Sequence, residues 1–219
     1  MKVRRFIPGA IALSAVLVAS ALPISAASAA PSAKAQLKSK PLSQVIAPAS
    51  RTWNSTWDDY NVVSHAVFAV LKAKPSSDVA VLADGNTRLT AFLPTDRAFQ
   101  RLVKDLTGKT YNKEQNVYKA ALTLGVPTIE QVLLYHVVPG ARITKSTALK
   151  ANNVKLATAQ GATIKVKVTR GPVILLVDKA TRITNPRVLL SQTNINLGNK
   201  QLAHGINRVL LPIPLKPKA

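Results

Sequence analysis

The chain lacks cysteine altogether, so no disulfide can hold its fold. Only Met1 is methionine, and aromatic residues make up just 5% of the 219 residues. A packed domain built from this sequence must therefore take its core from valine, leucine, isoleucine and alanine. The hydrophobic content of 47% is that of an ordinary globular protein, so such a core is within reach.

Residues that could carry catalysis are also scarce. The chain has nine acidic residues, and its three histidines, His65, His136 and His204, are isolated from one another in the sequence. No Gly-x-Ser-x-Gly nucleophile turn occurs, and a metal site would need clustered His, Asp, Glu or Cys ligands. The sequence predicts a non-enzymatic protein with no cofactor and no bound metal. A hydrolase is the least favoured class.

The first 29 residues have the three parts of a secretory signal peptide. A positive start containing Arg4-Arg5 precedes an apolar run over residues 10–22 and a small-residue cleavage pattern at 27–29. The run is shorter than the ~20 residues that span a membrane. Export with cleavage is therefore favoured over a membrane anchor, which predicts a secreted protein whose mature form has no transmembrane segment. The arginine pair leaves the twin-arginine route open beside the general one.

Residues 30–52 are rich in Ala, Ser, Pro, Lys and Gln, which predicts a flexible spacer. Trp53, Trp57 and Tyr60 then follow within eight residues. An aromatic trio of this kind can form an exposed platform for carbohydrate, but it more often anchors the edge of a core. The core interpretation is favoured because burial of aromatic rings removes much apolar area from water.

Charge of one sign dominates the chain, with a net charge of +21 that becomes 21 − 3 = +18 once Lys2, Arg4 and Arg5 are removed. From Arg142 onward there are fourteen Lys or Arg residues and one acid, Asp178. Such a field attracts anionic polymers, for example cell-wall polymer, acidic polysaccharide or extracellular DNA. The plainer interpretation is solubility and general adhesion to anionic material, and it is preferred because net charge does not define a site.

A strand, a sharp stop and a helix entry are encoded within residues 89–99. The apolar run at 89–93 suits a buried strand, and Pro94 ends it because proline has no N–H for the ladder. Thr95 is a good N-cap, and Asp96 lies in the first turn, where the helix dipole favours negative charge. Apolar residues then recur at helical spacing.

Two further apolar motifs follow in the second half of the chain. Residues 133–140 read Leu-Leu-Tyr-His-Val-Val-Pro-Gly, and a helix is predicted to run through them to Val138. His136 in this motif is expected to be a hydrogen-bonded structural residue, because buried polar groups need partners. Residues 202–212 read Leu-Ala-His-Gly-Ile-Asn-Arg-Val-Leu-Leu-Pro and predict a strand that ends at the proline.

Between these motifs the hydrophobic period changes from that of helices to that of strands. Residues 163–168 alternate strictly, with Lys165 and Lys167 on the opposite side from the apolar residues, and 173–177 is a continuous apolar run. The two lysines are possible contacts for a polyanion. Equally, they are solvent-face charges that protect a sheet edge from unwanted pairing.

The three motifs resemble, in order, the conserved segments of the fasciclin (FAS1) domain family: apolar strand then Pro-Thr-Asp and Ala-Phe, the Tyr-His pair, and the final strand. Two positions depart from the family pattern, because Asn207 stands where Asp is usual and Gly205 where Val is common. The asparagine keeps the acceptor oxygen but loses the charge.

The resemblance implies an α+β, FAS1-like fold, with N-terminal helices packed against a wedge-shaped β-sandwich. A single bacterial-type fasciclin domain is expected over 53–214, followed by a basic tail at 215–219. The implied function is that of a secreted adhesion or interaction module that binds extracellular protein or polysaccharide, free or at the cell wall, with no dedicated nucleic-acid fold. In animal members the Tyr-His segment is linked to receptor binding, so Tyr135 and His136 become candidates for an interaction motif.

Overall fold

The computed structural model describes residues 36–181 and 183–213, so the predicted signal peptide (1–29) and basic tail (215–219) lie outside the described residues. The helices, of α and 3-10 type, are α1 (Leu42–Ile46), η1 (Ala47–Arg51), α2 (Asn61–Ala73), η2 (Asp78–Ala83), α3 (Asp96–Thr107), α4 (Glu114–Leu122), α5 (Val126–Tyr135), α6 (Lys145–Leu149) and η3 (Leu190–Gln192). The strands are β1 (Leu89–Pro94), β2 (Val137–Pro139), β3 (Lys155–Ala157), β4 (Thr163–Thr169), β5 (Val173–Val177) and β6 (Gln201–Ile206).

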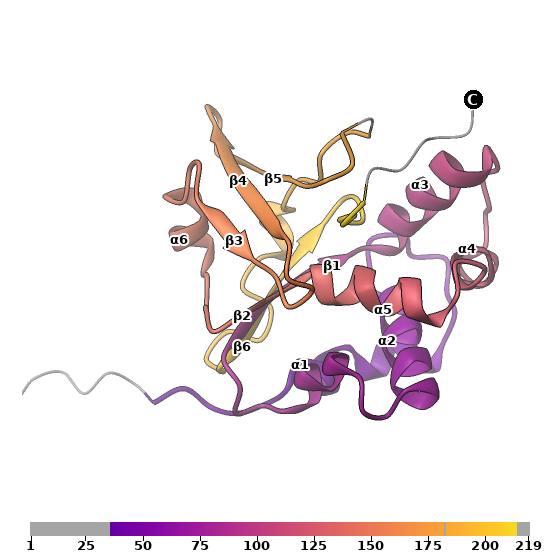
Figure 1. The fold of residues 1–219 in the computed structure, drawn as a ribbon, viewed down its shortest axis with the longest axis horizontal. Helices are drawn as coiled ribbons and strands as arrows, with labels where there is room; N and C mark the ends of the chain where they lie inside the picture. Colours follow the sequence, from indigo (N-terminus) through magenta and orange to yellow (C-terminus); the bar gives the residue numbers. More distant parts are fainter. Residues whose placement is uncertain (1–35, 182, 214–219) are drawn as a thin grey trace, which may run out of the picture. The chain divides into compact units, whose positions relative to one another are not determined.

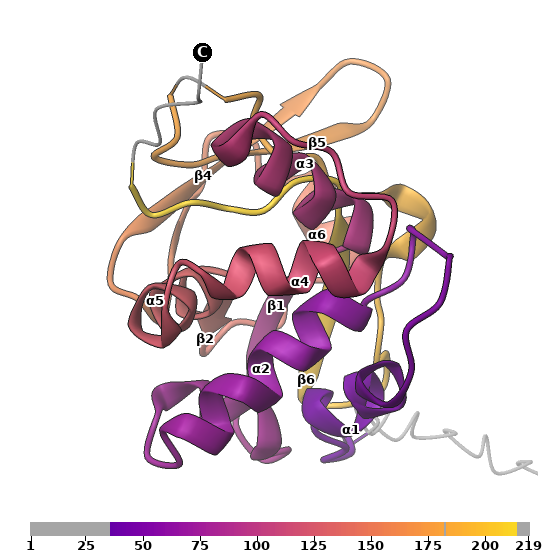
Figure 2. The same cartoon turned by 90° about the vertical axis from the view of Figure 1, so that its right-hand side faces the viewer.

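The strands form two small sheets, with strand orders β2-β1-β6 and β3-β4-β5. In the first sheet β1 runs antiparallel to β2 and parallel to β6, in the register Leu89↔Gln201 through Pro94↔Ile206. The second sheet is an antiparallel meander. Helices α2, α4 and α5 lie on the side of the first sheet away from the second sheet (Figure 1), and in the turned view they stand in front of the strands (Figure 2). The α+β class expected from the sequence is confirmed, with the strands divided between two sheets.

Strand β1 is buried on both faces, which explains its unbroken apolar run. Ala91 and Leu93 belong to the core cluster that the helices build, whereas Phe92 belongs to the cluster beneath the second sheet. Successive side chains of a strand point to opposite faces, so β1 alternates between the two cores. The first sheet is therefore the layer that divides the core of the domain.

The stop after β1 forms as the sequence predicts. The strand ends at Pro94, and the Thr95 hydroxyl accepts a hydrogen bond from the N–H of Ala98 at 3.3 Å to cap α3. Helix α3 ends at Gly108, whose φ of 72° is the left-handed conformation that glycine adopts without a Cβ penalty. These local signals fix where the helix starts and ends.

Three predictions of local structure are wrong. The final strand, expected to end at Pro212, ends at Ile206, where Asn207 turns to bond with the backbone of Arg187. The helix expected to reach Val138 ends at Tyr135, because the β-branched pair Val137-Val138 forms β2 and pairs with β1. The spacer predicted as flexible is folded over its described residues, 36–51. There Leu42 and Ile46 are 1% and 3% exposed, and their helix belongs to the same compact unit as the rest of the domain.

Gln201 explains why this N-terminal segment packs so closely. Its side chain is fully buried at the start of β6, and its Oε1 accepts a hydrogen bond from the N–H of Leu42 at 2.7 Å. Its Nε2 donates to the carbonyls of Val81 and Asp84 at 2.7 and 2.9 Å. One side chain thus satisfies backbone groups of two other segments. The polar composition of 30–52 gives no sign of this packing, because only two apolar side chains of the segment, Leu42 and Ile46, are buried.

We expect Leu42→Ala to lower the free energy of unfolding by about 2–5 kcal/mol, the usual cost of truncating a fully buried leucine. Gln44→Ala, at an exposed position of the same helix, is the matched control and should change little. Denaturant unfolding of both variants measures the difference. Equal midpoints for wild type and Leu42→Ala would mean that this segment does not contribute to the fold.

Candidate interaction site at the ends of the paired strands

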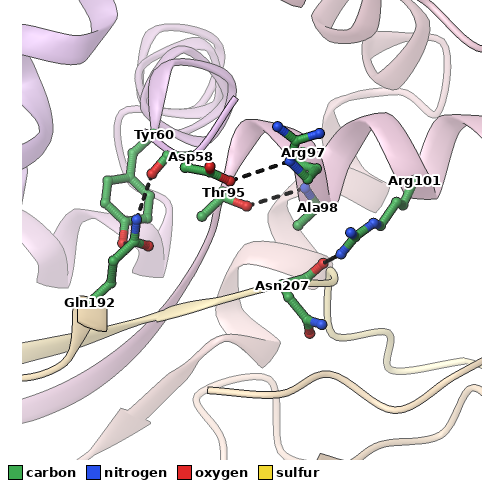
Figure 3. Close-up of polar contacts among 8 residues, drawn as sticks. All are labelled: Asp58, Tyr60, Thr95, Arg97, Ala98, Arg101, Gln192 and Asn207. Carbon is green, nitrogen blue, oxygen red and sulfur yellow. Dashed lines mark hydrogen bonds and ion pairs between the residues drawn. The ribbon is translucent and has the colours of Figure 1, made fainter. Parts of the chain in front are cut away.

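The parallel strands β1 and β6 end side by side, and polar residues of the start of α3 lie there near Asp58, Tyr60, Gln192 and Asn207 (Figure 3). On the first turns of α3, the Arg101 Nη1 donates to the carbonyl oxygen of Asn207 at 2.9 Å. The side-chain Oδ1 of Asn207 accepts from the N–H of Arg187 at 2.7 Å, and its own N–H donates to the Arg187 carbonyl at 3.1 Å. Asn207 therefore holds the residues that follow β6 between α3 and the segment around 187.

Three further arginines interact electrostatically with Arg101, and we call Arg97, Arg101, Arg187 and Arg208 the arginine cluster. Burial, and then the charges of Arg208 and Arg97, lower the pKa of Arg101, with a further contribution from Arg187. Two carboxylates pair with members of the cluster: Asp105 lies 2.8 Å from Arg208, and Asp58 lies 3.3 Å from Arg97 at the surface.

The four guanidinium groups of the cluster thus face two paired carboxylates. An aspartate at 207, as in the family pattern, would supply a third carboxylate at the centre. Asn207 preserves the hydrogen bond to Arg187 without that charge. The site is left with a net positive charge.

Gly205 makes room for a hydrogen bond at the rim of this site. The Tyr60 hydroxyl donates to Gln192 Oε1 at 2.8 Å, and Gln192 Nε2 donates to the Asp58 carbonyl at 2.7 Å. A Cβ on Gly205 would lie 2.4 Å from the Tyr60 oxygen and 2.5 Å from Gln192 Oε1, far inside van der Waals contact. Glycine at 205, where the family commonly has valine, therefore leaves the space that the Tyr60–Gln192 hydrogen bond occupies.

A buried acidic group supports the site from beneath. Asp96 is fully buried, and its two oxygens accept hydrogen bonds from the N–H groups of Asn61 and Val62 at 3.1 and 2.8 Å, which caps α2 from another helix. Burial, followed by a hydrogen bond with Asp59, raises the pKa of Asp96 to about 8. The expectation that Asp96 serves the dipole of its own helix misses this role.

The same group is the candidate cation site among the described residues, because oxygens of Asp59, Asp96 and Glu114 lie within 4.8 Å of one another. Four of its six oxygens accept hydrogen bonds within the fold, whereas Asp59 Oδ1 and Glu114 Oε1 are buried without a partner. Asp96 accepts two N–H groups, and Glu114 Oε2 accepts from Asn61 Nδ2 at 2.9 Å. The raised pKa of Asp96 favours a proton on this carboxyl, which can then donate to the carboxylate of Asp59.

Tyr135 and His136, the predicted interaction motif, are 0% and 4% exposed. The Tyr135 hydroxyl donates to the carbonyl of Thr163 at 3.0 Å. His136 Nδ1 lies 2.6 Å from the Val132 carbonyl and must donate, because Nε2 accepts from the N–H of Leu210 at 2.9 Å. Burial lowers the pKa of this neutral imidazole to about 4. Neither side chain offers a surface to a partner in this conformation, which does not support a direct contact role.

The other candidates divide between surface and core. Lys165 and Lys167 are exposed on β4, and Lys155 stands opposite Lys165 on β3. Trp53, with Trp57 and Tyr60, packs against the helical core, and its ring stacks on His65 with centroids 3.9 Å apart. The placement of the trio matches the favoured core interpretation.

Sequence reasoning missed the arginine cluster, which unites residues from α3, the segment around 187 and the end of β6. The spacing of Arg97 and Arg101 by four positions signals only a shared helix face. The unusual Asn207 was the one marker of the site that could be read in advance. What joins the members is the register of β1 with β6.

Comparisons with known proteins agree with this architecture. A family model of the fasciclin domain matches residues 64–212. Among solved structures, a FAS1 domain pair from the insect cell adhesion molecule fasciclin I matches with a TM-score of 0.52 and 14% sequence identity, over 80% of this chain and 51% of that chain. The match thus spans about half the length of that domain-pair chain, and the likeness concerns the fold. No curated protein matched the sequence.

An α+β domain of this topology, with the family match over most of its described length, belongs to a class of extracellular adhesion-type modules. The chain is a member of the fasciclin family. In the part of the chain that the structure describes, no helix is long and apolar enough to cross a bilayer.

We expect Gly205→Val to lower the free energy of unfolding by about 1–3 kcal/mol, the usual cost of overpacking. Adding Tyr60→Phe to this variant removes the oxygen 2.4 Å from the new Cβ and should recover part of the loss. Thermal unfolding of the single and double variants tests the coupling. A Gly205→Val protein as stable as wild type would show that the Tyr60–Gln192 pair moves aside without cost.

The buried Asp96 predicts a pH dependence of stability. Its carboxyl ionises near pH 3.8 when exposed and near 8 in the fold, so its contribution is full below about pH 4 and is lost as the pH rises through about 8. His136 acts oppositely, and its contribution is lost as the pH falls from 6.5 through about 4. Because His136 and His204 still titrate in the unfolded chain near pH 6.5, the contribution of Asp96 between pH 6.5 and about 8 is obtained as the difference between wild type and a variant without this carboxyl.

Asp96→Asn should abolish the fall in stability across that window, because the amide cannot ionise and keeps an acceptor oxygen. Urea unfolding of wild type and variant at several pH values measures the slope. Parallel curves for the two proteins would show that Asp96 is already ionised at pH 6.5.

Proposed function

We propose that the protein is a secreted, non-enzymatic fasciclin-type module that binds an extracellular protein or glycan bearing acidic groups, with the arginine cluster as its contact surface. The observation that carries the proposal is that Arg97, Arg187 and Arg208 act electrostatically on Arg101, which bonds to Asn207, the position where the usual carboxylate is missing. Family membership supports the general class of adhesion module.

Guanidinium chemistry indicates what the partner must offer. Arginine presents a planar fork of donors that matches carboxylate, sulfate or phosphate oxygens with two parallel hydrogen bonds. The cluster stands on rigid elements, since Arg97 and Arg101 lie on α3 and Asn207 is held by backbone hydrogen bonds. A pre-ordered surface of this kind favours a shaped contact with one partner over loose adhesion.

The assignment as non-enzymatic rests on the state of the buried histidines. His136 uses both ring nitrogens within the fold, and His204 lies 2.7 Å from the Ile143 carbonyl through Nε2 and accepts from Asn194 through Nδ1 at 3.4 Å. Burial lowers the pKa of both imidazoles. A general base must reach a substrate proton, and these side chains are turned inward.

The second candidate is a basic electrostatic binder of anionic polymers, in which charge acts over the whole surface. Its specific support is the exposed face of the second sheet, where Lys155, Lys165 and Lys167 lie together. Such binding weakens steeply as salt rises, because each neutralised anionic group releases a counterion. A shaped contact through the arginine cluster loses less affinity with salt.

Two asparagine-to-aspartate variants separate the surfaces. Asn207 and Asn152 each use Oδ1 to accept a backbone N–H, from Arg187 at 2.7 Å and from Val168 at 3.0 Å. Both changes keep that hydrogen bond and lower the net charge by the same amount, one in the arginine cluster and one beside β4. Asn207→Asp should weaken binding to a carboxylated or sulfated polysaccharide about fivefold, the effect of ~1 kcal/mol of charge interaction.

The measurement is affinity for that polysaccharide, and for matrix protein and DNA, at low and high salt. Binding weakened by Asn207→Asp alone supports the arginine cluster. Equal losses in both variants, with all binding gone at high salt, would favour the electrostatic alternative. A loss confined to Asn152→Asp would place the contact on the second sheet.

A further inference from the structure

A cavity of about 100 Å³ lies between α3, α4, α5 and the segment that follows β6. Its wall is built from side chains such as Phe99, Leu102, Ala121 and Leu211. His136 also borders it, but both of its ring nitrogens are used inside the fold, and no polar atom adds surface to the cavity. The space therefore lacks the partners that a buried water needs.

The size and chemistry of the cavity suit a hydrocarbon group. A dry apolar cavity of about 150 Å³ in another protein takes up benzene, so a volume of about 100 Å³ holds a short stretch of alkyl chain. A charged group inside would lose its hydration without gaining a partner. The cavity thus selects for an apolar occupant.

A shallow groove of different character lies beside the cavity. Thr128, Val132 and Ile213 border both spaces, which are therefore adjacent and separated by these side chains alone. The groove adds the amide side chains of Gln131 and Gln160, so neutral donors and acceptors stand near the opening. Ile213 is 50% exposed at this junction, an unusual position for a large apolar side chain.

We propose that the cavity binds the end of the alkyl chain of a single-chain amphiphile, whose neutral, hydrogen-bonding head lies against Thr128, Gln131 and Gln160. An apolar interior beside a neutral polar groove matches a molecule with those two parts in the same order. The charged surfaces of the domain take no part. This ligand site is separate from the arginine cluster and does not depend on the proposed function.

The test uses the purified protein with radiolabelled octan-1-ol as probe and dodecan-1-ol as competitor. Wild type should bind the probe saturably, release it to dodecan-1-ol, and unfold at a higher temperature in the presence of the alcohol. Ala121→Leu fills the cavity from α4, and Thr128→Phe, at an exposed position, covers its opening. Each should weaken probe binding at least tenfold.

Lys119→Phe adds the same aromatic group at an exposed position of α4 that borders neither space, and it should bind like wild type. Because Thr128→Phe changes only an exposed side chain, it remains informative if Ala121→Leu fails to fold. Equal binding by all variants would overturn the proposal, because the probe would then be held elsewhere.

A shortened protein tests whether the cavity has a different occupant. A chain ending at Ile213 tests whether the residues that follow occupy the cavity instead. Binding that arises only in this shortened protein would assign the cavity to the chain's own end and overturn the amphiphile proposal. If neither the full chain nor the shortened chain binds the probe, the amphiphile proposal is also overturned.

Discussion

The parallel pairing of β1 with β6 is the constraint on which the rest of this domain depends. Six consecutive residue pairs join strands that are 112 positions apart in the chain, as Leu89↔Gln201 shows, and both strands are buried throughout. Because β1 contributes to the helical core with one face and to the inter-sheet core with the other, a shift by one residue would exchange the two sets of side chains. The same pairing sets Gln201 against the N-terminal segment and Asn207 against α3.

The residues that mark the family build the fold, and the departures from the family pattern shape the surface. Thr95 and Asp96 cap helices, and Tyr135 and His136 satisfy backbone groups inside the domain. In contrast, Asn207 leaves the arginine cluster with excess positive charge, and Gly205 admits the Tyr60–Gln192 pair. The family motif and the proposed contact surface thus lie next to each other without being the same residues, because burial that stabilises a side chain removes it from contact with partners.

Charge in this protein has both a diffuse and a local form. The net charge of +21 is spread over the sequence and describes how the molecule meets any anionic surface. The arginine cluster is a local arrangement, held by hydrogen bonds to backbone groups and by two ion pairs. The apolar cavity under α3, α4 and α5 is a third kind of surface, independent of charge. Binding through the diffuse charge, through the arginine cluster and through the cavity should therefore each depend differently on salt and on single substitutions.

The sequence by itself determined the local structures whose signals lie within a few residues. Pro94 and Thr95 set the end of β1 and the start of α3, and strict alternation set β4 with Lys165 and Lys167 outward. It could not show that residues 36–51 pack onto the domain, because two buried side chains and a glutamine 159 positions away from Leu42 hold them there. Nor could it assemble the arginine cluster. Which distant residues become neighbours is decided by strand register and helix packing, since these contacts form only when the whole chain is folded.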